Sequence, residues 1–150
     1  MIVVDASALI EVLLRTPAAS VVENLLFAEG QTLHGPHLLD VEVAHVIRRY
    51  AARGEIDGDR GRAALTDLSD FPLQRYPHDF LLPRVWELRN NLTAYDAVYV
   101  ALAEALDATL LTRDQRLAAL AGHFTGVELA YRSRGFRLVE EGRHLDPAVG

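Results

Sequence analysis

The hydrophobic positions of the chain fall into short continuous runs and longer runs with helical spacing. Ile2–Val4 and Thr109–Thr112 are short and apolar, which is typical of strands that are covered on both faces. Residues 92–106 carry polar side chains only sparingly, so they predict a helix that lies inside the domain. Thr93 stands three residues before Asp96, a spacing at which a hydroxyl and a carboxylate cap the first turn of a helix.

The same alternation continues through the rest of the chain. Further strands are expected at residues 32–34, 73–76 and 126–129. Helices are expected at residues 8–14, 17–30, 36–54, 62–68 and 80–88, and a last helix includes residues 118–121 and ends at Gly122. Thr112 with Gln115 has the spacing of a cap for the last of these helices. Strands and helices alternating at these distances predict an α/β domain with a central parallel sheet.

Length and composition limit the possible classes of protein. The 150 residues are enough for one domain that buries roughly 70% of its unfolded surface. The absence of cysteine excludes thiol catalysis, thiolate zinc sites and disulfides, and it fits a reducing compartment. The longest apolar run, residues 97–103, is far shorter than the roughly 18 residues of a membrane span. We therefore expect a cytoplasmic protein that is neither secreted nor embedded in a membrane.

The charge of the chain narrows the candidate chemistry further. A formal net charge of −6 argues against binding a polyanion through a broad basic surface, so a nucleic-acid substrate would require a metal ion. All 15 basic residues are arginine, which excludes a P-loop lysine and a Schiff-base lysine. Arginine does suit contacts with phosphate.

Four acidic residues are candidates for a functional site: Asp5, Asp96 and Asp114 stand where strands end or a helix begins, and Glu42 lies within a predicted helix beside its apolar stripe. Asp5 and Asp114 follow strands, and ligands of parallel sheets bind in the crevice outside the carboxyl ends of the strands. Asp5, Asp96 and Asp114 could each be explained as a helix cap or a first-turn charge, but Glu42 is flanked by valines and has no arginine or lysine three or four positions later. Together with Asp96, these carboxylates would repel one another unless a divalent cation such as Mg²⁺ bound between them.

Two other sets of residues are weaker candidates for a catalytic or metal site. Asp40 could replace Glu42, but on a helix the two side chains point some 200° apart. His34 and His37 bracket a predicted turn without a third metal ligand nearby.

The segments around the four acids resemble a known family. Asp5-Ala6-Ser7, the helix from Glu42 to Arg49, residues 92–97 and residues 110–114 are similar to the PIN domain of VapC-type toxins. The resemblance covers about residues 1–130 and does not account for the tail 131–150.

The resemblance implies a fold, an activity and partners. The fold is a PIN-like three-layer domain, with a central parallel sheet flanked by helices. The activity is that of the toxin of a type II toxin-antitoxin pair, an Mg²⁺- or Mn²⁺-dependent endoribonuclease that hydrolyses RNA phosphodiesters with a metal-activated water. The partners are RNA, a small VapB-like antitoxin and a second copy of the chain. The catalytic and metal-binding residues are Asp5, Glu42, Asp96 and Asp114, and Ser7, Thr112 and Arg113 support the site or bind substrate.

Two other functions stay open from the sequence. A protein of the same fold could cut DNA instead of RNA. The sequence contains no groove-reading element that would decide between these two substrates. The domain could also be a non-catalytic α/β binding module whose acids are only caps. Neither the RNA that is cleaved nor the antitoxin can be identified from these residues.

Overall fold

The computed structural model describes residues 1–130 and 138–139. Strands and helices alternate along them. The elements are β1 (Ile2–Val4), α1 (Ala6–Leu13), α2 (Ala19–Leu26), β2 (Leu33–Pro36), α3 (Leu38–Ala52), α4 (Gly58–Asp70), β3 (Leu73–Tyr76), the 3₁₀ helix η1 (Asp79–Leu81), α5 (Leu82–Glu87), α6 (Ala94–Leu106), β4 (Thr109–Thr112), α7 (Gln115–Ala121), β5 (Val127–Leu129) and β6 (Leu138–Val139).

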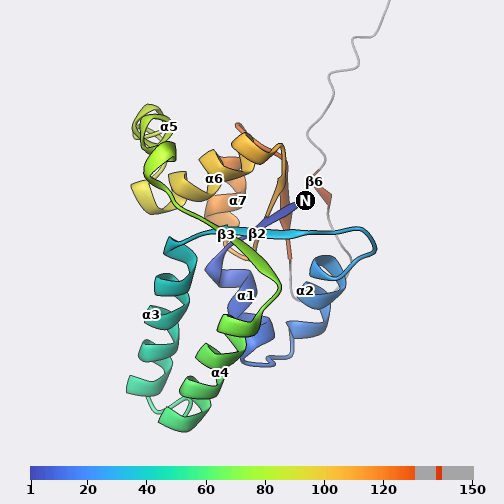
Figure 1. Ribbon diagram of the computed structural model, residues 1–150, viewed down its shortest axis with the longest axis vertical. Coiled ribbons are helices and arrows are strands. Elements are labelled where there is room, and N and C mark those ends of the chain that lie inside the picture. Colours follow the sequence, from blue (N-terminus) through green and yellow to red (C-terminus); the bar gives the residue numbers. More distant parts are fainter. Residues whose placement is uncertain (131–137, 140–150) are drawn as a thin grey trace, which may run out of the picture.

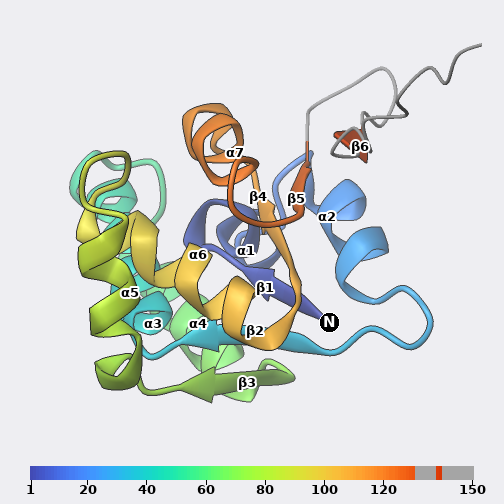
Figure 2. The same ribbon diagram turned by 90° about the horizontal axis from the view of Figure 1, so that it is seen from above.

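One sheet runs through the centre of the molecule. Its strand order is β3-β2-β1-β4-β5-β6, and β1 to β5 are parallel to one another (Figures 1 and 2). The short β6 is added antiparallel at the β5 edge. The predicted α/β fold with a central parallel sheet is therefore confirmed, with one antiparallel edge strand in addition.

Helices cover both faces of this sheet and complete the three layers. The first four helices pack together on one face, where α1 contacts α2, α3 and β4. Helices α5, α6 and α7 lie on the other face, and α6 crosses β1, β2 and β4 (Figures 1 and 2). Both faces of the central strands are thus shielded from solvent, which explains why β1 and β4 read as continuous apolar runs.

Helix α6 is the most deeply buried helix, as its composition predicts. Every residue from Ala97 to Ala103 is buried. The helix begins where Thr93 accepts a hydrogen bond from the Asp96 N–H at 3.2 Å, so the predicted cap is present. The carboxylate of Asp96 is consequently left on the first turn of a helix that is otherwise fixed in the core.

Several boundaries differ from those that the sequence predicts. Strand β2 extends to Pro36 because it pairs with β3 up to Tyr76. Helix α4 begins at Gly58, earlier than expected, since the Asp57 side chain caps it by accepting from the Arg60 N–H at 2.7 Å. The expected helix 80–88 is a 3₁₀ turn followed by α5, and Pro83 lies in the first turn of α5, where no backbone N–H is needed.

The tail 131–150 lies outside the described residues, apart from the two residues of β6. Within the described part of the chain, no helix combines the length and the hydropathy that crossing a membrane requires.

Candidate active site

The acidic residues of interest lie around the point where the strand order changes direction. The chain leaves β1 toward β2 on one side, and β4 occupies the other side of β1. Asp5 follows β1 directly and Asp114 follows β4 by one residue. This point, outside the carboxyl ends of adjacent parallel strands, is where open α/β sheets bind ligands.

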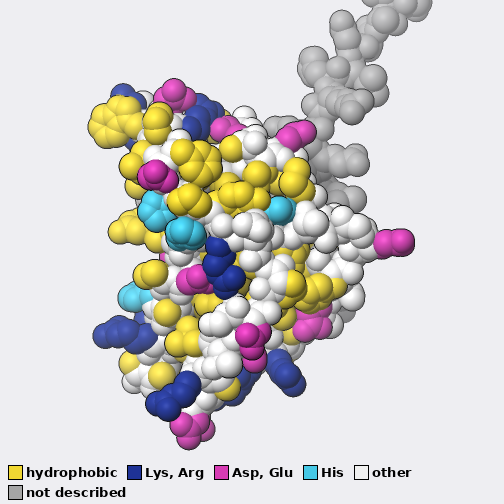
Figure 3. All heavy atoms as spheres, in the orientation of Figure 1, with side chains coloured by type: hydrophobic (Ala, Val, Ile, Leu, Met, Phe, Trp, Pro, Cys, Tyr) yellow, Lys and Arg dark blue, Asp and Glu magenta, His cyan; other side chains and the backbone are white. Residues whose placement is uncertain are grey.

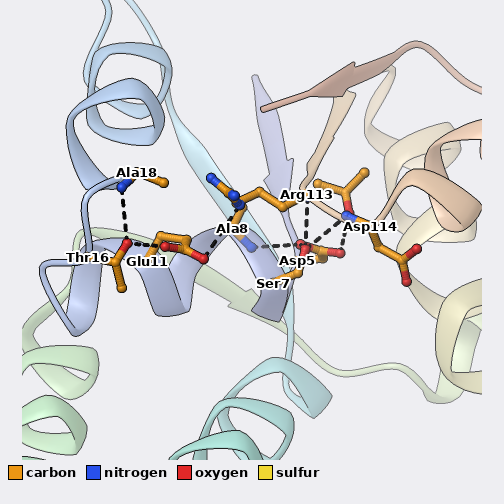
Figure 4. A network of polar contacts seen from close by, with 9 residues as sticks. Asp5, Ser7, Ala8, Glu11, Thr16, Ala18, Arg113 and Asp114 are labelled. Atoms are coloured by element: carbon orange, nitrogen blue, oxygen red, sulfur yellow. Dashed lines mark hydrogen bonds and ion pairs between the residues drawn. The ribbon is translucent and has the colours of Figure 1, made fainter. Parts of the chain in front are cut away.

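Asp5 is the centre of a hydrogen-bond network that joins the two strands. The Ser7 hydroxyl donates to Oδ1 of Asp5 at 2.7 Å, and the Thr112 hydroxyl donates to Oδ2 at 2.6 Å. The Ala8 N–H at the start of α1 also donates to Oδ1, at 3.1 Å. Figure 4 shows these groups converging on the Asp5 carboxyl between α1 and the end of β4. The predicted supporting role of Ser7 and Thr112 therefore has a geometric basis, because both hydroxyls orient this carboxylate.

The environment of Asp5 makes its ionisation sensitive to pH near neutrality. Burial raises the pKa of Asp5 to about 6, and the charge of Asp114 adds to this rise, whereas the three hydrogen-bond donors lower it. A carboxyl whose pKa is higher in the folded state binds its proton more tightly when folded. In the metal-free protein, the ionised Asp5 carboxylate therefore lowers the free energy of unfolding above pH 6. This destabilisation disappears as the pH falls toward 3.8.

We predict that the stabilisation of this protein by Mn²⁺ depends on pH through Asp5. The rise in melting temperature caused by Mn²⁺ should be large at about pH 8 and shrink as the pH falls through about 6, because a proton then competes for the carboxylate. Thermal melts with Mn²⁺ and with EDTA across this range measure the difference. If the rise in melting temperature caused by Mn²⁺ stays constant down to about pH 5, Asp5 is not a ligand of the ion.

Glu42 lies on the second turn of α3 and reaches the same region. The hydroxyl of Tyr99 on α6 donates to its Oε2 at 2.9 Å. Burial raises the pKa of Glu42, and the charges of Asp5 and Asp96 raise it further. Three predicted acids are thus close enough to influence one another electrostatically.

Tyr99 belongs to this site although it lies within the apolar run 97–103, which by itself indicates only packing in the core. Its ring is buried, and burial together with the Glu42 carboxylate raises the pKa of its hydroxyl above the usual range. The hydroxyl therefore stays protonated and donates to Glu42. Its position three residues after Asp96, on the same face of α6, is the sequence signal that could have identified it.

Asp96 is paired with a cation from another helix. The guanidinium of Arg116 in α7 donates from one nitrogen to Oδ2 of Asp96 at 2.9 Å. The Asp96 side chain is mostly covered, whereas that of Arg116 is 61% exposed. A positive group thus already occupies one of the predicted metal ligands.

Asp114 caps α7, and this corrects the expected cap by Thr112 with Gln115. The Oδ1 of Asp114 accepts from the N–H groups of Arg116 and Leu117, at 2.9 and 3.1 Å. Thr112 is unavailable as a cap because its hydroxyl donates to Asp5 and accepts from the Asp114 N–H at 3.0 Å. Thr112 instead connects the two acids at the ends of β1 and β4.

Two charged residues near the site point elsewhere. The Arg113 side chain lies 3.5 Å from Glu11 on α1 and not among the four carboxylates, while its backbone N–H donates to Ser7 at 2.9 Å (Figure 4). Its predicted contact with substrate stays a prediction, and its visible contribution is to position Ser7. The rival acid Asp40 is bound by Arg75 at 2.8 Å, so it supports the packing of α3 beside β3.

The oxygen ligands around Asp5 suit a hard divalent cation, although the ligand set is not preassembled. Among the residues that the structure describes, no three Asp, Glu or His side chains lie close enough to hold one ion. Mg²⁺ usually needs only one or two direct carboxylates and completes its shell with water. The raised pKa values of Asp5 and Glu42 indicate negative charge that a cation would relieve. These residues therefore fit such an ion, provided that Arg116 can leave Asp96.

Comparison with known proteins identifies the family. The profile of the PIN domain matches residues 2–123. Ribonuclease VapC1 of Mycobacterium tuberculosis is 47% identical over 121 residues, which are 80% of this chain and 90% of that protein. Ribonuclease VapC9 of the same species is 48% identical over 118 residues, 79% of this chain and 89% of that protein. The crystal structure of VapBC2 from Rickettsia felis, bound to a DNA fragment from its promoter, has a TM-score of 0.64 at 15% identity and covers 86% of this chain and 98% of that one.

The fold and the sequence together define the class. This chain belongs to the PIN domain family. Its relatives at 47% and 48% identity both carry the name VapC, which places it among the VapC-type members of that family.

Proposed function

We propose that this chain is the toxin of a type II toxin-antitoxin pair and acts as an endoribonuclease that depends on Mg²⁺ or Mn²⁺. The observation that carries the proposal is the network in which Ser7 and Thr112 aim both hydroxyl protons at the buried Asp5 carboxylate. A helix cap needs neither hydroxyl, since the Ala8 N–H alone satisfies that role. The names of the VapC ribonuclease relatives support RNA as the substrate.

The proposal gives each acid a role that its environment supports. Asp5 and Asp96 would hold the ion directly, and Glu42 and Asp114 would act on it directly or through water. When bound, Mg²⁺ or Mn²⁺ would lower the pKa of a water molecule and stabilise the charge that develops on the phosphate. The hydroxyls of Ser7 and Thr112 lower the pKa of Asp5 and so oppose the effect of its burial, and the Tyr99 hydroxyl lowers the pKa of Glu42 in the same way.

Cleavage of matched RNA and DNA strands tests this function against its alternatives. The purified chain is incubated with labelled single strands of the same sequence, with Mn²⁺ and with EDTA. We expect cleavage of the RNA only, and only with the metal. Cleavage of the DNA would favour a PIN-fold deoxyribonuclease. No cleavage of either strand would favour a non-catalytic binding module, and undiminished cleavage in EDTA would exclude the metal mechanism.

A further prediction concerns Arg116, which occupies Asp96 in the structure. Arg116→Gln should make Mn²⁺ bind more tightly, by about 2- to 5-fold, because the cation no longer competes with a partly exposed ion pair worth about 0.2–1 kcal/mol. Titration of the protein with Mn²⁺, followed by the signal of free Mn²⁺ in electron paramagnetic resonance, measures the dissociation constant.

Arg53→Gln is the matched control for this experiment. Arg53 has the same 61% exposed side chain and also pairs with an acid, Glu55, but it caps the end of α3 about 16 Å along the helix from Glu42. If both substitutions change Mn²⁺ affinity equally, only the net charge of the protein matters. If Arg116→Gln weakens binding, the arginine does not compete with the ion.

We also propose that a VapB-like antitoxin inhibits this chain by placing an arginine at the carboxylates. The contact between Arg116 and Asp96 supports the idea, since there a guanidinium lies against one of these acids. A crystal structure of the chain with its antitoxin tests the proposal. An open carboxylate site, with the partner bound elsewhere, would contradict it.

A homodimer is proposed through the apolar surface of η1 and α5. Phe80, Leu82 and Trp86 are exposed there, and apolar side chains gather over α5 at the upper left of Figure 3. Exposed clusters of large apolar side chains mark interaction surfaces. Sedimentation of the wild type and of Trp86→Glu should give a dimer and a monomer, respectively, and a monomeric wild type would contradict the proposal.

A further inference from the structure

A cavity opens beside Glu42, between the first half of α3 and the start of α6. Its volume is about 480 Å³, and its lining includes Val41, Glu42, His45, Arg49 and Tyr95. Ala6, the residue after Asp5, also contributes to it. The cavity therefore adjoins two of the four acids and extends away from them along α3. We call it the Glu42 cavity.

Two of its lining side chains expose large apolar surfaces. Tyr95 is 64% exposed and Val41 is 67% exposed. Tyr95 directly precedes Asp96, so an aromatic ring stands in solvent next to a predicted catalytic acid. The buried Tyr99, one turn later on α6, is used by Glu42, whereas no hydrogen bond of the Tyr95 hydroxyl occurs among the described residues. An exposed ring beside a reaction site is suited to stacking against a flat ligand.

The far end of the Glu42 cavity is cationic. His45 and Arg49 follow Val41 at intervals of four residues, so all three share one face of α3. No acid among the described residues lies within ion-pair distance of Arg49. Arg49 stands about 10 Å along the helix axis from Glu42. In a chain of net charge −6, this is a local cationic position that leads away from the acids.

We propose that the Glu42 cavity binds the nucleotide next to the scissile phosphate of a single-stranded RNA, with its base stacked on Tyr95 and the following phosphate bound by Arg49. This inference rests on the proposed ribonuclease function. An aromatic platform followed by a cation is the combination that single-stranded nucleic acid sites use. Charge favours RNA over an antitoxin segment that carries an arginine to the acids, because Arg49 would attract phosphate and repel that arginine.

The test measures both cleavage and binding for variants of the two contact residues. Tyr95→Ala should raise the KM for a fluorescein-labelled single-stranded RNA by about 5- to 150-fold, since a stacked base contributes about 1–3 kcal/mol. Its kcat should change far less. Tyr95→Phe keeps the ring and should behave as the wild type. Arg49→Gln should weaken binding of the same RNA in EDTA, measured by fluorescence anisotropy, and should make it less dependent on salt.

Matched controls separate this site from general effects. Phe27→Ala removes an exposed aromatic ring at the end of α2, outside the Glu42 cavity, and Arg48→Gln removes the arginine next to Arg49 that does not line it. Both controls should keep the wild-type KM. Equal effects of Arg48→Gln and Arg49→Gln would overturn the proposal.

The outcome also distinguishes this proposal from the function on which it rests. If the wild type cleaves RNA with Mn²⁺ and Tyr95→Ala cleaves with unchanged KM, only the subsite is wrong. If Tyr95→Ala leaves RNA binding intact but changes the sedimentation of the protein, the cavity is covered by a second copy of the chain, which also overturns the proposal. If the wild type cleaves no RNA, the proposed function itself fails.

Discussion

Asp5→Asn is expected to reduce RNA cleavage by about 10³-fold or more without destabilising the metal-free protein. A metal ion contributes several kcal/mol of transition-state stabilisation, and each 1.36 kcal/mol corresponds to tenfold in rate. Asparagine retains the shape of the side chain and its capping oxygen but removes the charge whose burial raises the pKa of Asp5 to about 6. The melting temperature in EDTA at neutral pH should therefore stay the same or rise, while the response to Mn²⁺ is lost.

Asp57→Asn provides the matched control for this substitution. Asp57 also caps a helix by accepting from the N–H three residues later, but it lies at the start of α4 and is exposed. The same chemical change there should leave cleavage and the Mn²⁺ response as in the wild type. If Asp5→Asn lowers the melting temperature in EDTA and retains substantial cleavage, Asp5 is a structural cap and not a catalytic acid.

Thr112→Val is expected to affect both stability and the pH dependence of cleavage. The substitution removes the donor to Asp5 and leaves the Asp114 N–H without its acceptor. The loss of these hydrogen bonds should cost about 1–3 kcal/mol, or roughly 3–10 °C in melting temperature. Without one of the donors that lower its pKa, Asp5 should also titrate at a higher pH, moving the acid limb of the rate profile upward by about one unit.

The opposite end of the same strand offers the control for Thr112→Val. Thr109 is only half-buried, and its hydroxyl makes no hydrogen bond within the described part of the chain. Thr109→Val should therefore shift neither the acid limb nor the melting temperature by a comparable amount. An unshifted acid limb for Thr112→Val would mean that this hydroxyl does not control the ionisation of Asp5.

Much of the fold could be predicted because the decisive signals are local. The strands β3 and β4 have the predicted bounds, since β3 lies between Pro72 and Pro77 and the apolar run of β4 lies between Asp107 and Asp114. Helix α6 has its predicted cap and buried surface. The boundaries that were missed are set by strand pairing or by a cap that lies ahead of the apolar run of the helix. Strand β2 is lengthened by β3, and α4 is started by Asp57.

The sequence indicated where the acids lie but not how they are connected, and their catalytic role stays a prediction. Asp5, Asp96 and Asp114 could be selected because they follow strands or begin a helix, and such positions meet at one edge of a parallel sheet. Glu42 was selected by its apolar neighbours within α3. Their partners could not be selected in the same way. Thr112 has the spacing of a cap, but its hydroxyl turns to Asp5, 107 positions away in the chain. The pairing of Arg116 with Asp96 likewise depends on how α7 packs beside α6.

Tyr99 illustrates how burial and function can coincide in one residue. Its ring fills the core between α6 and the sheet, and its hydroxyl reaches Glu42 from α3. A pattern of apolar positions detects the first property and says nothing of the second. Only the hydrogen bond between Tyr99 on α6 and Glu42 on α3, helices of opposite faces of the sheet, reveals that the two roles belong together.

The most direct test of this account is to locate Mn²⁺ in a crystal of the protein by its anomalous scattering. We predict a peak within direct coordination distance of the Asp5 carboxylate, on the side that faces Asp96 and Asp114, with the Arg116 side chain displaced from Asp96. Crystals of the Asp5→Asn variant soaked in Mn²⁺ in the same way should lack this peak. A wild-type crystal soaked in Mn²⁺ without a peak at Asp5, or with its peak at acids remote from the ends of β1 and β4, would contradict the claim that these carboxylates form a metal site.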